Sequence, residues 1–152
     1  MEEAAYIDAV RLVAWDLPPG WQPVLDERMG NLGELFGIVR PNRAYFGEKD
    51  WQQLQLVRDM ARAFFLDLEV VPCPVVREAD GLAMSSRNAR LSEEDRQLAP
   101  EFYRVLSSGK PVEEMASALG QAGFEVDYVE RRGDRVLGAV RLGKVRLIDN
   151  VE

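Results

Sequence analysis

Two short groups of residues carry the side chains that are best suited to chemistry. Lys49 and Asp50 follow an aromatic run, and Gln53 lies one helical turn further on. A second group, Ser85-Ser86-Arg87, places two hydroxyls beside a guanidinium group. Hydroxyls next to a rigid guanidinium fork suit phosphate oxygens, and a lysine is a point cation that can follow negative charge as it moves. The two groups are therefore candidates for a site that binds a phosphate-bearing ligand.

Each of these residues also has an ordinary structural interpretation. Lys49 could be an exposed loop lysine, and Gln53 could lie on the surface of a helix. Ser85-Ser86-Arg87 could be a polar turn that leads into a helix beginning near Ser92. Patterns of three residues are too short to separate these alternatives.

The first half of the chain alternates between helical and extended patterns. Residues 6–15 are compatible with a helix or a strand, and Asp50 is a candidate N-cap. Strands and helices in alternation favour a parallel sheet with helices on its faces, and in such sheets ligands bind at the carboxyl ends of the strands. The predicted elements are a helix over 25–39, a strand over 43–46, a helix over 51–65 and a strand over 68–74.

The second half begins with a polar loop over 77–91 and ends with alternating residues. Ser92 is the predicted N-cap of a helix that runs to about residue 106, and Gly123 is predicted to end a second helix over 112–121. Short strands follow, one over 124–128 and one or two over 136–148. The clearest linker is Ser107–Pro111, so the predicted domains are residues 1–108, an α/β domain, and 111–152, a small α+β domain.

Composition excludes several classes of protein. The chain has 152 residues, 47% of them hydrophobic, and a net charge of −7, which argues against binding to nucleic-acid phosphates. No apolar run is long enough to cross a membrane, and the acidic start Met1-Glu2-Glu3 differs from a signal peptide, so a cytoplasmic protein is expected. A single cysteine, Cys73, cannot form an internal disulfide and is expected to be buried on a strand.

Three longer runs resemble one enzyme family. The runs are Pro41–Leu54, Val75–Asn88 and the ending Arg146–Asn150. Together they resemble pantothenate synthetase, the pantoate–β-alanine ligase family, in the C-terminal half of its nucleotide domain and a shortened C-terminal domain. The resemblance implies a truncated Rossmann-like sheet of the HIGH-type nucleotidyl transferases, with a small C-terminal α+β unit.

The same resemblance implies nucleotide-binding roles. Gly47 and Asp50 correspond to positions that hold the ribose of ATP, and Val76 and Met84 to positions that frame the adenine. For Val76 and Met84, packing in the core is the alternative. Gln53 corresponds to a glutamine that bonds a hydroxyl of the acid substrate. The residues with implied catalytic roles at the phosphates are Lys49, Ser85, Ser86 and Arg87.

The implied reaction needs ATP and Mg²⁺ and makes a carbon–nitrogen bond. In the family, a carboxylate attacks the α phosphorus, pyrophosphate leaves, and an amine captures the acyl adenylate. The family's N-terminal half also supplies a pair of histidines of the H-x-G-H type around the phosphates, whereas this chain contains no histidine. A remodelled site that uses ATP or a preformed acyl donor is therefore expected, and the residues suggest no protein-bound metal.

Three functions are compatible with these observations. The first is a ligase that joins a pantoate-like acid to a β-alanine-like amine, with a homodimer as a candidate assembly. The second is a non-catalytic module that binds a nucleotide or small molecule, or has a regulatory role. The third is one half of a split ligase whose missing half comes from a partner chain. In all three, Arg77, Glu78 and Asp80 are expected to shape the loop rather than to act in catalysis.

Overall fold

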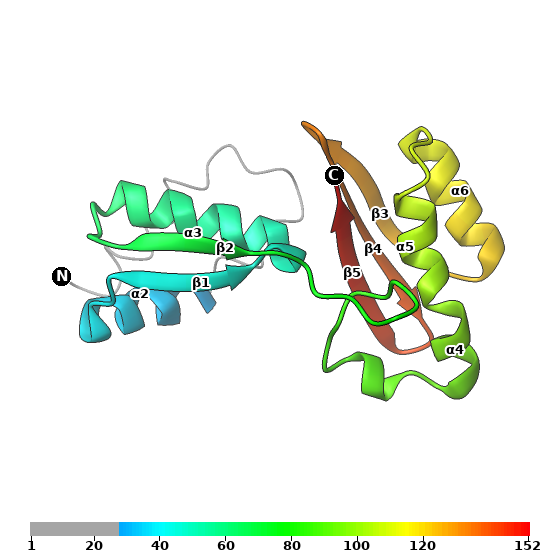
Figure 1. Cartoon of the computed structure of the whole chain (residues 1–152), viewed down its shortest axis with the longest axis horizontal. Helices are drawn as coiled ribbons and strands as arrows, with labels where there is room; N and C mark the ends of the chain where they lie inside the picture. Colours follow the sequence, from blue (N-terminus) through cyan, green and yellow to red (C-terminus); the bar gives the residue numbers. More distant parts are fainter. Residues whose placement is uncertain (1–27) are drawn as a thin grey trace. The chain divides into compact units, whose positions relative to one another are not determined.

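The computed structural model describes residues 28–152, which form two compact units (Figure 1). The first unit contains residues 28–47 and 51–73, and the second contains residues 48–50 and 74–152. The predictions for residues 6–15 and 25–27 lie outside the described residues. No helix within residues 28–152 is long and apolar enough to cross a membrane.

The first unit has a parallel pair of strands. Strand β1 (Arg43–Gly47) pairs in parallel with β2 (Glu69–Cys73), with Gly47 opposite Cys73. Helix α2 (Arg28–Val39) precedes β1, and helix α3 (Trp51–Ala63) comes between the two strands along the chain. The predicted order of helix, strand, helix and strand, with parallel pairing, is thus confirmed. Cys73 ends β2 as predicted, but it is half-buried.

Apolar side chains from both helices form the core of this unit. Phe36 of α2 packs edge-to-face on Phe46 of β1, with ring centroids 6.5 Å apart. The predicted apolar stripe of α3 is confirmed at Leu54, Val57 and Ala61, which are buried because they recur on one face of the helix. Burial of this stripe holds the helix in the core of the unit.

The chain enters α3 differently from the prediction. A 3₁₀ turn, η2 (Glu48–Asp50), precedes the helix, and Gly47 before it is extended. The helical turn therefore begins before Asp50, so the predicted N-cap position is wrong. A tight turn directly after an extended residue lets the backbone change direction at the carboxyl end of β1.

The second unit has an antiparallel sheet with helices beside it (Figure 1). Strands β3 (Glu125–Arg132), β4 (Arg135–Leu142) and β5 (Val145–Val151) pair in that order, so two strands follow β3, within the predicted one or two. Helices α5 (Pro100–Leu106) and α6 (Val112–Ala122) pack on the sheet through one apolar cluster. Its fully buried members include Phe102, Leu106, Met115, Leu119 and Val140.

Three local predictions concern the helices of the second unit. Ser92 caps helix α4 (Glu93–Leu98) as predicted, since its side chain accepts a hydrogen bond of 3.1 Å from the Asp95 amide. Gly123 ends α6 with φ = 107°. The single helix predicted from Ser92 to residue 106 is wrong, because Pro100 cannot donate a backbone hydrogen bond and starts the separate helix α5.

The division into units also differs from the boundary predicted at 108–111. Helices α5 and α6 flank the Ser107–Pro111 linker, and both contribute to the same apolar cluster of the second unit. A polar linker can join two helices of one core, and composition alone does not distinguish that arrangement from a domain boundary.

Close packing of α5 on β4 gives a stability prediction. A Cβ atom at Gly138 would lie 2.9 Å from Phe102 Cε2 and 3.0 Å from Leu106 Cδ2. We therefore expect Gly138→Ala to lower the free energy of unfolding by about 1–3 kcal/mol, measured by urea denaturation. Gly120→Ala in α6 is the matched control, because nothing lies within 4 Å of its Cβ position. That change should raise stability by about 0.5–1 kcal/mol. Equal effects of the two changes would contradict the packing argument.

Candidate functional site

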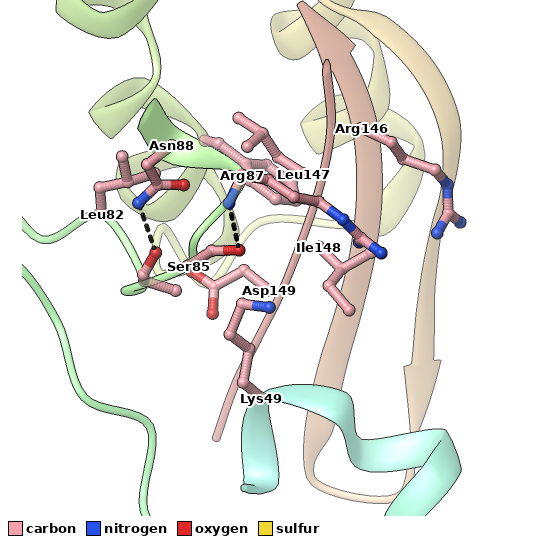
Figure 2. A pocket seen from close by; sticks show the side chains of 11 residues that line it. Lys49, Leu82, Ser85, Arg87, Asn88, Arg146, Leu147, Ile148 and Asp149 are labelled. Atoms are coloured by element: carbon pink, nitrogen blue, oxygen red, sulfur yellow. Dashed lines mark hydrogen bonds between the residues drawn. The ribbon is translucent and has the colours of Figure 1, made fainter. Parts of the chain in front are cut away.

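Three of the predicted residues line one pocket of the second unit (Figure 2). Lys49 comes from η2, Ser85 and Arg87 come from the loop before α4, and β5 supplies one wall. The empty volume is about 280 Å³, which includes space open to solvent. The enclosed part of this space is only about 10 Å³, room for about one water molecule, so a ligand would contact Lys49, Ser85 and Arg87 from the open mouth of the pocket. The lining residues are Lys49, Leu82, Ala83, Ser85, Arg87, Asn88, Phe102, Arg146, Leu147, Ile148 and Asp149.

Lys49 extends from η2 toward the loop that carries Ser85 (Figure 2). Only 16% of its side chain is exposed, and its Nζ atom lies 3.7 Å from a carboxylate oxygen of Asp50. The alternative interpretation as an exposed loop lysine is therefore wrong. A cation with little contact with solvent interacts more strongly with an incoming anion than a surface lysine does.

The loop with Ser85 and Arg87 has a defined backbone. The Met84 amide donates to the Val76 carbonyl at 2.9 Å, closing a narrow hairpin, and the Asn88 amide donates to the Ser85 carbonyl at 3.0 Å. The Ser85 hydroxyl accepts a hydrogen bond of 3.2 Å from the Arg87 amide. The 3₁₀ turn η3 (Asn88–Arg90) follows. Short-range bonds of this kind hold Ser85 at the pocket while the side chain of Arg87 stays exposed.

Arg77 anchors this hairpin to strand β5. Its Nη1 atom donates to Asp149 Oδ2 at 2.6 Å and to the Gly81 carbonyl at 3.1 Å, and its Nη2 atom donates to Asp149 Oδ1 at 3.1 Å. The guanidinium carbon lies 3.8 Å from the centre of the Tyr103 ring. Bidentate pairing with a carboxylate and stacking on an aromatic ring are both strong interactions of the arginine guanidinium group. The predicted loop-shaping role of Arg77 is confirmed.

Glu78 and Asp80 have the same role at the outer side of the hairpin. Arg96 of α4 donates to Glu78 Oε2 and to Asp80 Oδ2, each at 2.6 Å, and Asn88 Nδ2 donates to Glu78 Oε1 at 2.8 Å. The hydrogen bonds from Asn88 and Arg96 lower the pKa of Glu78, and the hydrogen bond from Arg96 lowers the pKa of Asp80. Both carboxylates therefore brace the loop, as predicted.

These lowered pKa values give a pH prediction. The folded protein binds protons at Glu78 and Asp80 less readily than the unfolded chain, so their contribution to stability is present above the ordinary carboxyl pKa range. The contribution is lost as the pH falls through the lowered values. Arg96→Gln should therefore lower Tm at about pH 6 and reduce the fall in Tm between about pH 6 and pH 3, measured by circular dichroism. Arg90→Gln is the control, and equal pH profiles for both variants would contradict the assignment.

Four predicted residues lie on the second unit without being buried in its core. Val76 and Met84 are 63% and 54% exposed, so the alternative of core packing is wrong for both. The Asp50 carboxylate is half exposed beside Lys49. Ser86 is exposed and is not among the residues that line the pocket. Their nucleotide-binding roles stay predictions.

Two other predicted residues belong to the first unit. Gly47 ends β1, and Gln53 lies in the first turn of α3. Along the sequence, η2 with Lys49 lies between Gly47 and the start of α3, which contains Gln53. Their roles toward ribose and the acid substrate also stay predictions.

Several residues that line the pocket were given no role from the sequence. Asn88 is buried, and its Nδ2 atom donates to the Ala83 carbonyl at 3.1 Å as well as to Glu78. Asp149 is 3% exposed at the back of the pocket. Both residues lie inside runs that had been singled out for their resemblance. That resemblance was the available signal, but it gave no role to either residue.

Arg146 is held beside the pocket by a carboxylate. A register shift between Val126 and Tyr128 in β3 places Asp127 where it accepts from Arg146 Nε at 2.6 Å and from Arg141 Nε at 3.1 Å. Burial alone would raise the pKa of Asp127, but the hydrogen bonds from Arg146 and Arg141 outweigh it and keep the pKa low. The Arg146 guanidinium is turned away from Lys49 (Figure 2). It therefore pairs with Asp127 of β3, although Arg146 lines the pocket together with Lys49 and Arg87.

Comparison with known proteins identifies the family. The model for pantoate-beta-alanine ligase matches residues 32–152. The pantothenate synthetase of Bdellovibrio bacteriovorus is 54% identical over 119 residues, which cover 78% of this chain and 47% of the relative. That of Coxiella burnetii is 50% identical over 118 residues, covering 78% of this chain and 46% of the relative. The chain thus spans about half the length of the curated relatives it matches.

Solved structures give the same result. Pantothenate synthetase from Thermus thermophilus superposes with a TM-score of 0.68 and 42% identity, covering 80% of this chain and 53% of that chain. Pantoate-beta-alanine ligase from Francisella tularensis, complexed with beta-gamma ATP and beta-alanine, gives a TM-score of 0.75 and 34% identity, covering 81% and 48%. The predicted Rossmann-like α/β class with a small α+β unit is confirmed, and this chain belongs to the pantoate–β-alanine ligase family.

Proposed function

We propose that this chain contributes the phosphate-binding side of a carbon–nitrogen ligase that uses ATP to join a pantoate-like acid to a β-alanine-like amine. The observation that carries the proposal is the pocket shared by Lys49, Ser85 and Arg87. Membership of the family supports the choice of reaction. Two cations and a hydroxyl from distant parts of the sequence meet there, as a site for a polyphosphate requires.

The proposed chemistry needs charge stabilisation rather than a protein nucleophile. The carboxylate of the acid attacks the α phosphorus of ATP, the bond to the β-phosphate oxygen breaks, and pyrophosphate leaves with the electron pair. Lys49 and Arg87 balance the negative charge that builds up on the leaving group, and Ser85 donates a hydrogen bond to it. The amine then displaces AMP from the acyl adenylate and loses a proton.

We infer that Mg²⁺ arrives with the nucleotide. Within residues 28–152, no group of three or more histidine, cysteine, aspartate or glutamate side chains could hold a metal ion. Mg²⁺ usually keeps several waters and binds through substrate phosphates together with few protein ligands, which suits this arrangement. Its contribution would be to neutralise phosphate charge.

The cytoplasmic location stays a prediction.

A second candidate is one half of a two-chain ligase, because the chain has no histidine to act at the phosphates. Large apolar side chains that are exposed on the first unit favour a partner protein that covers them, since apolar surface open to solvent can mark an interaction site. The exposed fractions are 50% for Leu35, 81% for Ile38, 59% for Val39, 64% for Tyr45 and 94% for Phe65. A non-catalytic nucleotide-binding module is the remaining alternative.

Thermal-shift titration of the full chain with Mg-ATP tests the proposal. A ligand that binds only the folded state raises Tm in a saturable way. We expect such a shift, followed by pyrophosphate release when pantoate and β-alanine are added. Binding without release would favour the non-catalytic or two-chain alternatives. Absence of any shift would contradict a nucleotide site in this chain.

A further inference from the structure

The last strand of the chain holds the backbone of Lys49. Asn150 Nδ2 donates to the Glu48 carbonyl at 2.8 Å and to the Lys49 carbonyl at 2.9 Å. We propose that Asn150 is a positioning residue, which fixes Lys49 at the pocket through these two bonds. The inference rests on the proposed function for its consequence in ligand binding, whereas the contact itself can be tested without a nucleotide.

An amide is the side chain that this position requires. Two carbonyl oxygens need two donors on one atom, and the Asn150 NH₂ group provides them, whereas an ionised aspartate of the same shape provides none. Asn150 is 2% exposed, and its Oδ1 atom accepts from Arg135 Nη1 at 2.5 Å. Because the group is buried, loss of its donors would leave two carbonyls facing an acceptor, which is a costly arrangement.

The adjacent residue holds the other half of the site. Asp149 receives the fork of Arg77, and the same guanidinium donates to the Gly81 carbonyl and, at 3.2 Å, to the Asn150 carbonyl. The backbone N–H of Asn150 also donates to Asp149 Oδ1 at 2.8 Å. Asn150 therefore holds the segment of Lys49, and Asp149 holds the hairpin that leads to Ser85. Both segments are fixed to the same strand, β5.

Fixing the backbone of Lys49 in this way is expected to affect ligand affinity. A lysine side chain loses considerable rotational freedom when it is ordered on a ligand, and a backbone that is already fixed reduces the remaining cost. The bonds from Asn150 fix the backbone of η2, so only the side chain of Lys49 remains to be ordered when the anion binds. Asn150 is thus expected to affect ligand affinity without touching the ligand.

Chemical labelling of lysine amines tests the contact directly. The lysines of the chain are Lys49, Lys110 and Lys144, and the last two are exposed. In the full chain, an acylating reagent followed by peptide mass spectrometry should label Lys49 more slowly than the other two. In Asn150→Asp, the rate at Lys49 should rise about threefold, with Lys110 and Lys144 unchanged, because local opening exposes η2.

A matched control separates positioning from general stability. Val140→Ala removes a buried core side chain away from η2, so it should lower Tm while leaving the labelling rate of Lys49 unchanged at temperatures far below Tm. Asn150→Ser keeps one hydroxyl donor and should give a smaller rise than Asn150→Asp. It also provides a testable variant should Asn150→Asp not fold. Unchanged labelling in a folded Asn150 variant would overturn the inference.

Titration with Mg-ATP on the same variants distinguishes the two proposals. We expect Asn150→Asp to weaken Mg-ATP binding by about tenfold, and Val140→Ala to leave it unchanged in the folded protein. Faster labelling of Lys49 with unchanged Mg-ATP affinity would overturn the role in ligand binding. If wild-type protein shows protected Lys49 but no Mg-ATP binding, the proposed function fails, while the rise in labelling still supports Asn150 as the residue that holds Lys49.

Discussion

Replacement of Lys49 by alanine is expected to weaken Mg-ATP binding by roughly 10- to 100-fold, because hydrogen bonds to charged groups contribute about 1.5–3 kcal/mol. The side chain is 16% exposed and lines the pocket with Ser85 and Arg87. Its removal takes away a partly desolvated cation. Isothermal titration calorimetry of the full chain with Mg-ATP measures the change.

The lysine at position 110 provides the matched control. Lys110 is exposed between α5 and α6, so Lys110→Ala changes the net charge equally but leaves the pocket intact. Its affinity for Mg-ATP should match that of wild type. Arg87→Ala should weaken binding in the same direction as Lys49→Ala. If all three variants bind equally well, the anion site lies elsewhere.

Replacement of Arg77 by methionine is expected to lower the free energy of unfolding by about 3–5 kcal/mol, because it leaves the buried Asp149 carboxylate without its cation. The Asp149 side chain is 2% exposed, and the Arg77 side chain is 20% exposed. The change also removes the donors to the Gly81 and Asn150 carbonyls. Urea denaturation, followed by circular dichroism, measures the loss.

A second substitution tests the cause of that loss. Asp149→Asn in the Arg77→Met background removes the orphaned charge and should recover part of the stability. The same Asp149→Asn change in the wild-type background should be destabilising, since it weakens the pair with Arg77. If Asp149→Asn lowered the free energy of unfolding as much in the Arg77→Met background as in the wild-type background, the buried charge would not be the reason for the loss.

Local order was predictable from the sequence where short-range chemistry decides it. The apolar stripe of α3, the Ser92 cap and the stop at Gly123 follow from residues within one or two turns of each other. Parallel pairing of β1 with β2 followed from the alternation of strand and helix. Lys49, Ser85 and Arg87 could be singled out because two of the runs that contain them were long enough to be recognised, and their roles at phosphates stay predictions.

Contacts between distant parts of the chain were not predictable in this way. Nothing in the run Arg146–Asn150 indicates that its asparagine donates to carbonyls near residue 49, since any donor pair could do so. The break at Pro100 is a different case, because a proline is itself a local signal for a helix boundary and the prediction overlooked it. The unit division was missed because the contacts of η2 and α5 are tertiary. Such features depend on which surfaces meet, and sequence periodicity does not contain that information.

The bond between η2 and β5 has a consequence for the order of events during protein synthesis. Glu48 and Asn150 are separated by 102 positions in the chain, so the backbone of Lys49 reaches its final position only after the last strand has left the ribosome. Until then, β1, α3 and β2 can form locally, while the segment of Lys49 lacks the two hydrogen bonds that hold its backbone. A ribosome-bound chain that stops before β5 should therefore show Lys49 labelled as fast as an exposed lysine, and protection should begin only once β5 has emerged.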